Sequence, residues 1–192
     1  MVQEEARIPI HRPNPSEMLF FFLCGVVTSV PLTIFIAQFA DSLLVGYSLF
    51  YTQLISTALF APLIEEFSKI FPLFYRHGET QRSVFNLALL VGLGFGLVEM
   101  LTYVFVIGVP IQVRLPGLLF HPASTAISAY GIATKKPLLF YGIAVALHFA
   151  SNFLAVTNPF QPISASILIV GITVFVAWYL RNRTREKIIM YR

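Results

Sequence analysis

Long apolar runs separated by short polar connections dominate this sequence of 192 residues. Six runs approach or exceed the roughly 20 apolar residues that a helix needs to cross a bilayer. They occupy residues 18–40, 43–75, 84–108, 116–133, 138–156 and 163–180. The connections have no room for a soluble domain, so we expect one integral membrane domain over residues 1–192. The pattern predicts an all-α, polytopic membrane helix bundle with about six transmembrane helices.

The second run, residues 43–75, is longer than one span needs and contains Pro62. Proline lacks the N–H group of a helical residue and clashes with the preceding turn. We therefore expect a bend at residues 57–60 inside one segment, although two separate pieces would also fit the pattern.

The basic residues predict the orientation of the bundle. Of the 13 lysine and arginine residues, Lys69 lies within a run and Arg114 lies in a connection. If the N-terminus is cytoplasmic, the other eleven all face the cytoplasm: Arg7, Arg12, Arg76, Arg82, Lys135, Lys136, Arg181, Arg183, Arg185, Lys187 and Arg192. Cytoplasmic loops carry such an excess of positive charge. Both termini are thus predicted inside, with a cytoplasmic segment at residues 1–17 and a basic tail at residues 181–192.

The composition agrees with residence in a lipid bilayer. Charged residues make up 11% of the chain, against about 25% in soluble domains. The net charge of +4 comes from scattered residues, so no nucleic-acid partner is expected. The single cysteine, Cys24, excludes an internal disulfide framework. The first run is too long for a signal-peptide core and is expected to be retained.

Polar side chains interrupt four of the runs. They are Glu65, Glu66, Lys69, Glu99, His121, Thr125, His148 and Asn152. Each ionisable group at the bilayer centre costs about 2.5–3.5 kcal/mol, which packing alone does not justify. Counted along the helices, the glutamates and histidines lie about 15–24 Å from the cytoplasmic end, near one depth. Gly92 and Gly96 have a spacing that lets two helices approach closely. We therefore expect one shared functional site, although each group alone could be structural.

Several chemistries are compatible with these residues. A glutamate can act as a general base, and a histidine or amide can stabilise an oxyanion. Two histidines with glutamates would also suit zinc, but the sequence has no HExxH motif. No serine or cysteine has the context of a nucleophile. A proton-coupled transporter and a non-catalytic scaffold are the alternatives from other functional classes.

Four segments together resemble the PrsW family of intramembrane proteases. They are "EEFSK" at residues 65–69, "FGLVE" at 95–99, "FHPAST" at 120–125 and "HFASN" at 148–152. This family is distantly related to CAAX-processing and bacteriocin-processing proteases and to the non-proteolytic APH-1 subunit of gamma-secretase. The resemblance covers the expected catalytic core helices, residues 61–152. One departure is Met100, where the family usually has asparagine.

The resemblance implies an intramembrane endopeptidase that cleaves a membrane-protein substrate, such as an anti-sigma factor-like regulator, in a prokaryotic plasma membrane. Glu65 would be the base that activates water, and His148 with Asn152 would stabilise the oxyanion. Glu66, Glu99 and His121 would complete the catalytic centre, with Lys69 and Thr125 in support. A metal, zinc if any, would be held by Glu66, Glu99, His121 and His148. The oligomeric state is not predicted.

Overall fold

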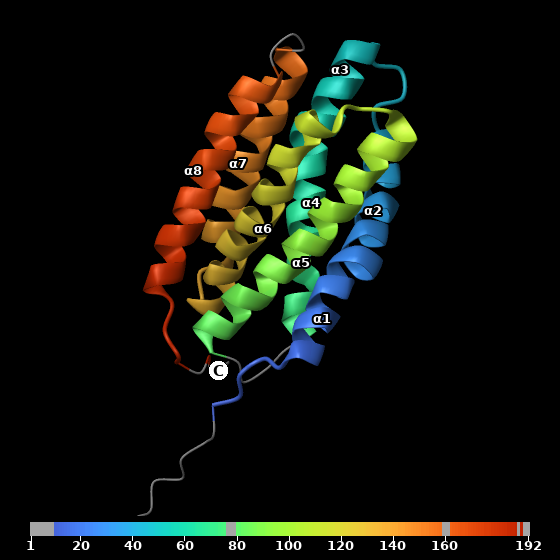
Figure 1. The fold of residues 1–192 in the computed structure, drawn as a ribbon. Coiled ribbons are helices and arrows are strands. Elements are labelled where there is room, and N and C mark those ends of the chain that lie inside the picture. Colours follow the sequence, from blue (N-terminus) through green and yellow to red (C-terminus); the bar gives the residue numbers. More distant parts are fainter. Residues whose placement is uncertain (1–9, 76–79, 159–161, 188, 190–192) are drawn as a thin grey trace, which may run out of the picture.

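The computed structural model describes residues 10–75, 80–158, 162–187 and 189, and the side chains of the last stretch from residue 167 onward. The described chain is helical apart from its connections and contains no β-strand. The first half comprises α1 (Pro15–Cys24), η1 (Gly25–Ser29), α2 (Val30–Ser42), α3 (Leu49–Gln53), η2 (Leu54–Phe60), α4 (Ala61–Ile70) and η3 (Phe71–Tyr75). The second half comprises α5 (Gln81–Leu101), η4 (Thr102–Ile107), α6 (Ile111–Ala133), α7 (Pro137–Thr157) and α8 (Pro162–Arg183). Successive pieces join into long rods that stand side by side (Figure 1).

The expectation of an all-α membrane protein is confirmed for the described residues. Three rods are long and apolar enough to cross a membrane, namely Pro15–Ser42, Gln81–Ile107 and Pro137–Thr157. Each of the other three predicted runs is also helical, but six spans and cytoplasmic termini stay predictions. Two boundaries were wrong. The second rod begins at Leu49 rather than residue 43, and α6 begins at Ile111 rather than residue 116.

The second rod is one continuous helical segment rather than two pieces. Its backbone is helical from Leu49 to Tyr75, and the expected bend falls within the π-helical stretch η2. The N–H of Ala61 donates to the carbonyl of Ser56, five residues back. Pro62 follows directly after this stretch, as the second residue of α4, and has no N–H to donate to the preceding turn.

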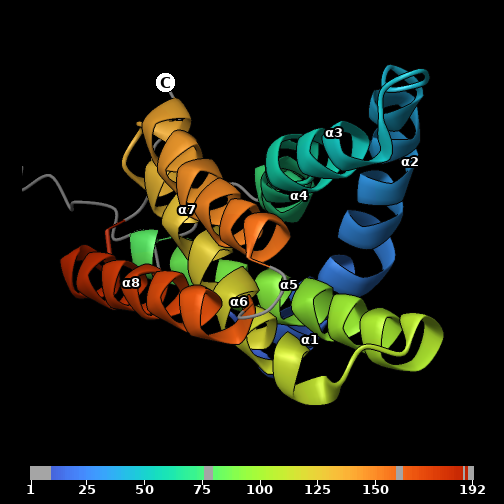
Figure 2. The same cartoon turned by 90° about the horizontal axis from the view of Figure 1, so that it is seen from above.

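Helix α6 is the centre of the bundle. Figure 2, which looks down the rods, shows it between α5, α7 and α8, and it packs against all three. From Phe120 to Ala133 nearly every side chain of α6 is buried. The two described apolar cores lie on either side of it, one including Phe21 and Val91 and the other Phe85 and Ile127.

Glycines bring α5 and α6 into close contact. A Cβ atom on Gly92 would lie 2.5 Å from the carbonyl oxygen of His121, and one on Gly96 would lie 3.1 Å from the His121 ring. Such distances leave no room for a side chain at Gly92, so the close packing depends on glycine. The small-residue spacing predicted from the sequence therefore does join two helices, and it does so beside a histidine.

Candidate active site

Four helices bring the predicted polar residues together in the interior of the bundle. Helix α4 supplies Glu65, Glu66 and Lys69, α5 supplies Glu99, α6 supplies His121, and α7 supplies His148 and Asn152. Because α4, α5 and α7 all pack against α6, residues that are far apart in sequence meet around one histidine.

Glu66 and Lys69 form a fully buried ion pair. The Lys69 ammonium lies 2.6 Å from Oε1 of Glu66, and neither side chain is exposed. The same oxygen accepts hydrogen bonds from the hydroxyl of Ser124 at 3.0 Å and from Nδ1 of His148 at 2.8 Å. Three donors on this oxygen offset part of the cost of burying the charge, while Oε2 of Glu66 is buried without a hydrogen-bond partner. Glu66 thus ties α4 to both α6 and α7.

The hydrogen bonds of His121 define its tautomer. The Lys69 ammonium, which can only donate, lies 3.1 Å from Nδ1 of His121. Nε2 therefore carries the proton and donates to Oε2 of Glu99 at 2.5 Å. The neutral imidazole is held between a cation and a carboxylate, with its ring fixed from both sides.

His148 has the opposite arrangement. Its Nδ1–H donates to Glu66, so the lone pair of Nε2 in the neutral ring is directed toward the site, 3.7 Å from Oε2 of Glu65. A histidine that donates through one nitrogen to a carboxylate is oriented to bind a metal or a proton through the other. Donation to an oxyanion, as implied by the family resemblance, requires the doubly protonated ring.

Arg114 is a site residue that the sequence analysis missed. It was assigned to a connection, but it lies in α6 and its guanidinium donates to Oε1 of Glu99 at 2.6 Å. The guanidinium also lies over the ring of Tyr103, 3.8 Å from its centroid. The signal was its position seven residues before His121, which is two helical turns on the same face. The sequence analysis did not use this spacing because it took Pro116 as the first helical residue.

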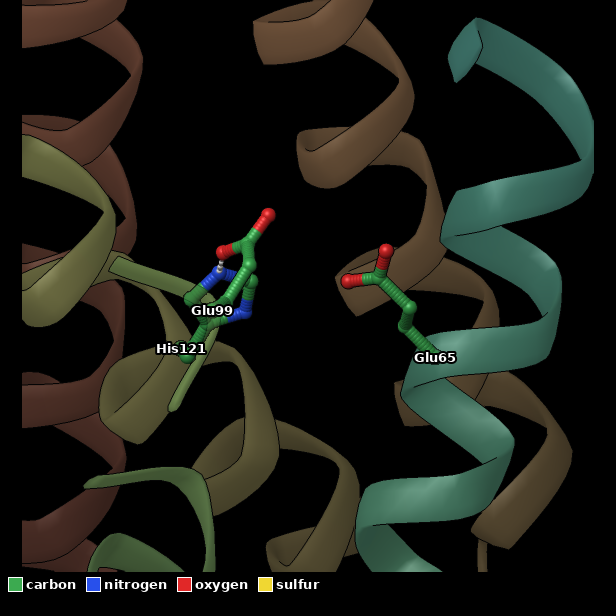
Figure 3. A group of neighbouring side chains, drawn as sticks. All are labelled: Glu65, Glu99 and His121. Atoms are coloured by element: carbon green, nitrogen blue, oxygen red, sulfur yellow. Dashed lines mark hydrogen bonds and ion pairs between the residues drawn. The ribbon is translucent and has the colours of Figure 1, made fainter. Parts of the chain in front are cut away.

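Glu65 faces the Glu99–His121 pair across the site (Figure 3). Its Oε2 is buried and makes no hydrogen bond to any described residue. These three residues each offer one ligand atom, and the three atoms lie within 4.8 Å of one another. Two carboxylates and one imidazole are suitable ligands for a catalytic zinc, which keeps a further position open for water. The expected ligand set differs in two ways: it had Glu66 in place of Glu65, and it included His148, which is not in this group.

A small cavity of about 70 Å³ adjoins these residues. Its lining includes Glu99, Arg114, His121, His148 and Asn152. A water molecule occupies about 30 Å³ in the liquid, so the cavity has room for one or two. Polar residues of α5, α6 and α7 therefore line one cavity, whereas Glu65, Glu66 and Lys69 of α4 are not among its lining residues.

Two of the predicted residues have mainly structural contacts. The amide Nδ2 of Asn152 donates to the carbonyl of Thr57 at 2.9 Å, which ties α7 to η2 while the side chain lines the cavity. The hydroxyl of Thr125 donates to the carbonyl of His121 and packs against Gly92, outside the cavity lining.

Comparison with known proteins agrees with this geometry. A family model described as PrsW family intramembrane metalloprotease matches residues 14–180. Searches of curated proteins and of solved structures found no match. The matched region includes every polar residue of the site, and together with the three apolar helices it supports an integral membrane protease. The chain belongs to the PrsW family of intramembrane metalloproteases.

Proposed function

We propose that this protein hydrolyses a peptide bond within a membrane-protein substrate, using water activated by Glu65. The observation that supports this role is the buried Oε2 of Glu65, which makes no hydrogen bond and faces the Glu99–His121 pair. A carboxylate oxygen without a donor is free to accept a proton from water. The Oε2 of Glu66 is also buried without a hydrogen-bond partner. However, Glu66 is held through Oε1 by Lys69, Ser124 and His148 and does not belong to the group formed with Glu99 and His121, so we assign the step to Glu65.

The remaining groups have complementary roles in the proposed reaction. Water loses a proton to Glu65 as its oxygen bonds to the carbonyl carbon of the substrate, giving a tetrahedral intermediate. The negative oxygen that forms accepts hydrogen bonds from two groups. They are the second amide hydrogen of Asn152 and the Nε2–H of protonated His148. When the carbon–nitrogen bond breaks, Glu65 returns the proton to the leaving amine. Each proton is thus accounted for by residues at the cavity.

The donor set also fits a divalent metal, and we propose zinc. Glu65, Glu99 and His121 would hold it, because they offer one ligand atom each within 4.8 Å. When bound, the metal supplies a Lewis acid that makes a coordinated water more acidic. Glu65 can ligate with one oxygen and accept a proton with the other. The proton between His121 and Glu99 must leave first, because a ligating histidine nitrogen carries none.

We infer the substrate class from the surroundings of the site. Three rods around the site are long and apolar enough to cross a membrane, so we expect the reacting segment to reach it from within the bilayer. The family resemblance favours a membrane-bound regulator, such as an anti-sigma factor, whose cleavage would be a step in regulated proteolysis in a prokaryotic plasma membrane. Distant kinship with CAAX-processing proteases and APH-1 stays a prediction from the motifs.

The proposal is tested by Glu65→Gln in purified protein reconstituted into liposomes with labelled single-span reporter peptides. The amide cannot take a proton from water, so cleavage falls about 10²–10⁴-fold. Glu186→Gln is the matched control, because it makes the same change outside the site. Glu186 lies in the tail, where its carboxylate accepts a hydrogen bond from the hydroxyl of Thr80. Thermal unfolding should be similar for all three proteins. Cleavage by Glu65→Gln at the wild-type rate would refute the role of Glu65.

A further inference from the structure

An apolar groove runs along the face shared by α6 and α8. One hollow of about 450 Å³ lies between residues 112–119 of α6 and residues 167–174 of α8. A second hollow of about 380 Å³ continues beside α5 and shares Leu119 and Val174 with the first. We call the two together the α6–α8 groove. Its lining is apolar except for Gln112 and, at the far end, Arg181.

The α6–α8 groove adjoins the cavity of the candidate active site. Pro116 and Val170 line both the groove and the cavity that contains Glu99 and His121. A chain that follows the groove therefore reaches the polar residues without crossing another helix.

The backbone of α6 is unusual along this groove. Pro116 and Pro122 lie inside the helix and have no N–H to donate to the carbonyls of Gln112 and Leu118, four residues earlier. All four residues line the groove, so both proline-interrupted turns of α6 lie along it. A carbonyl without a donor costs several kcal/mol in hydrocarbon. A lipid acyl chain offers no donor, whereas an unwound peptide offers one N–H per residue.

Gly171 gives close access to the groove from α8. It lines the first hollow, and a Cβ atom added there would meet no atom within 4 Å. Small residues on membrane helices allow another backbone to approach closely. Gly171 therefore leaves room for the backbone of a peptide to lie against α8.

We propose that the α6–α8 groove receives an apolar membrane-spanning segment of the substrate and leads it to the active site. The segment is locally unwound, and its N–H groups donate to the carbonyls of Gln112 and Leu118. This inference rests on the proposed proteolytic function and adds to it the route by which the substrate reaches the site. The occupant is an apolar, helical single-span protein.

Gly171→Trp tests the route, with Gly142→Trp as the matched control. A Cβ atom on Gly142 of α7 also meets no atom within 4 Å, and Gly142 does not line the groove. With labelled single-span reporter peptides in liposomes, Gly171→Trp should raise KM about tenfold, the effect of losing a well-packed apolar contact. Gly142→Trp should leave KM unchanged. Cleavage of a short soluble peptide with the same scissile bond should be equal in both. Equal kinetics of the two variants on the reporters would overturn the route.

Photocrosslinking separates this proposal from the proposed function, because it needs no cleavage. Benzophenone is attached to Gly171→Cys or Gly142→Cys after Cys24, the only native cysteine, is replaced by alanine. The reporter peptide should crosslink to the first position several-fold more than to the second. Crosslinking to lipid alone at Gly171→Cys would overturn the docking proposal. If the Gly171→Cys protein crosslinks the reporter while the wild-type protein cleaves none of it, proteolysis is refuted and docking is not.

Discussion

Glu65 and Glu66 are neighbours in sequence, but one helical step of about 100° turns their side chains toward different partners. Glu66 is fully buried, and its Oε1 holds Lys69, Ser124 and His148. Glu65 instead faces Glu99 and His121 across the site. At the scale of single residues, one carboxylate organises the site and the other is available to react or to bind a metal.

Arg114 gives a prediction about the orientation of Glu99. Its guanidinium holds Oε1, which leaves Oε2 directed at His121. Arg114→Leu should lower kcat for a reporter peptide about tenfold, because a hydrogen bond to a charged group is lost. Arg114→Lys keeps one charged donor and should recover part of the rate with KM unchanged. If both variants cleave at the wild-type rate, Arg114 does not position Glu99.

Metal binding gives a second prediction at this scale. A ligand that binds only the folded protein stabilises it, by about 2.7 kcal/mol at 100 times its Kd. Protein stripped with a chelator should therefore melt at a lower temperature than zinc-loaded protein, and it should lose activity. Glu99→Gln should abolish the zinc-dependent shift, whereas Glu186→Gln should keep it. Full activity after stripping would favour a metal-free mechanism.

At the scale of helices, packing between α5 and α6 sets the geometry of the site. Gly92 and Gly96 let α5 approach the backbone and ring of His121, and Glu99 lies one turn beyond on α5. The π-helical segment η2 contributes on the opposite side, where the Thr57 carbonyl accepts the amide of Asn152. Such segments are frequent at functional sites.

Gly92→Ala tests the close packing. The new methyl group would lie 2.5 Å from a backbone oxygen, so α5 and α6 must separate. Overpacking of this kind destabilises by about 1–3 kcal/mol. Activity should also fall, because Glu99 moves away from His121. Gly142→Ala is the control and should be neutral or slightly stabilising, since alanine favours helix. The measurement is the free energy of unfolding in detergent. If both variants are as stable as the wild type, the prediction is wrong.

At the scale of the whole molecule, an apolar exterior surrounds one polar layer. Large apolar side chains are exposed on rods throughout the described bundle, whereas the glutamates and histidines converge at α6. The chain after α8 returns to the start of α5, where the N–H of Gln81 donates to the carbonyl of Lys187. This arrangement matches a bundle that meets lipid outside and holds water inside.

Topology can be tested by labelling single cysteines in a variant that lacks Cys24. The positive-inside bias places residues 135 and 136 in the cytoplasm. Lys135→Cys should therefore react with a membrane-impermeant maleimide only after the cells are broken. Ser48→Cys and Val109→Cys, in the connections at the other end, should react in intact cells. Labelling of Lys135→Cys from outside would reverse the orientation.

The sequence by itself determined the helical class, the apolar runs, the set of polar residues and the family, because hydrophobicity and helical spacing are local properties. The ordered motifs at residues 65–69, 95–99, 120–125 and 148–152 were sufficient to identify the family, which the family model confirmed. Only the tertiary structure decided that Glu65 rather than Glu66 joins Glu99 and His121, and that Arg114 reaches Glu99. These contacts depend on the rotation and offset of each helix against its neighbours, which packing of the whole bundle sets.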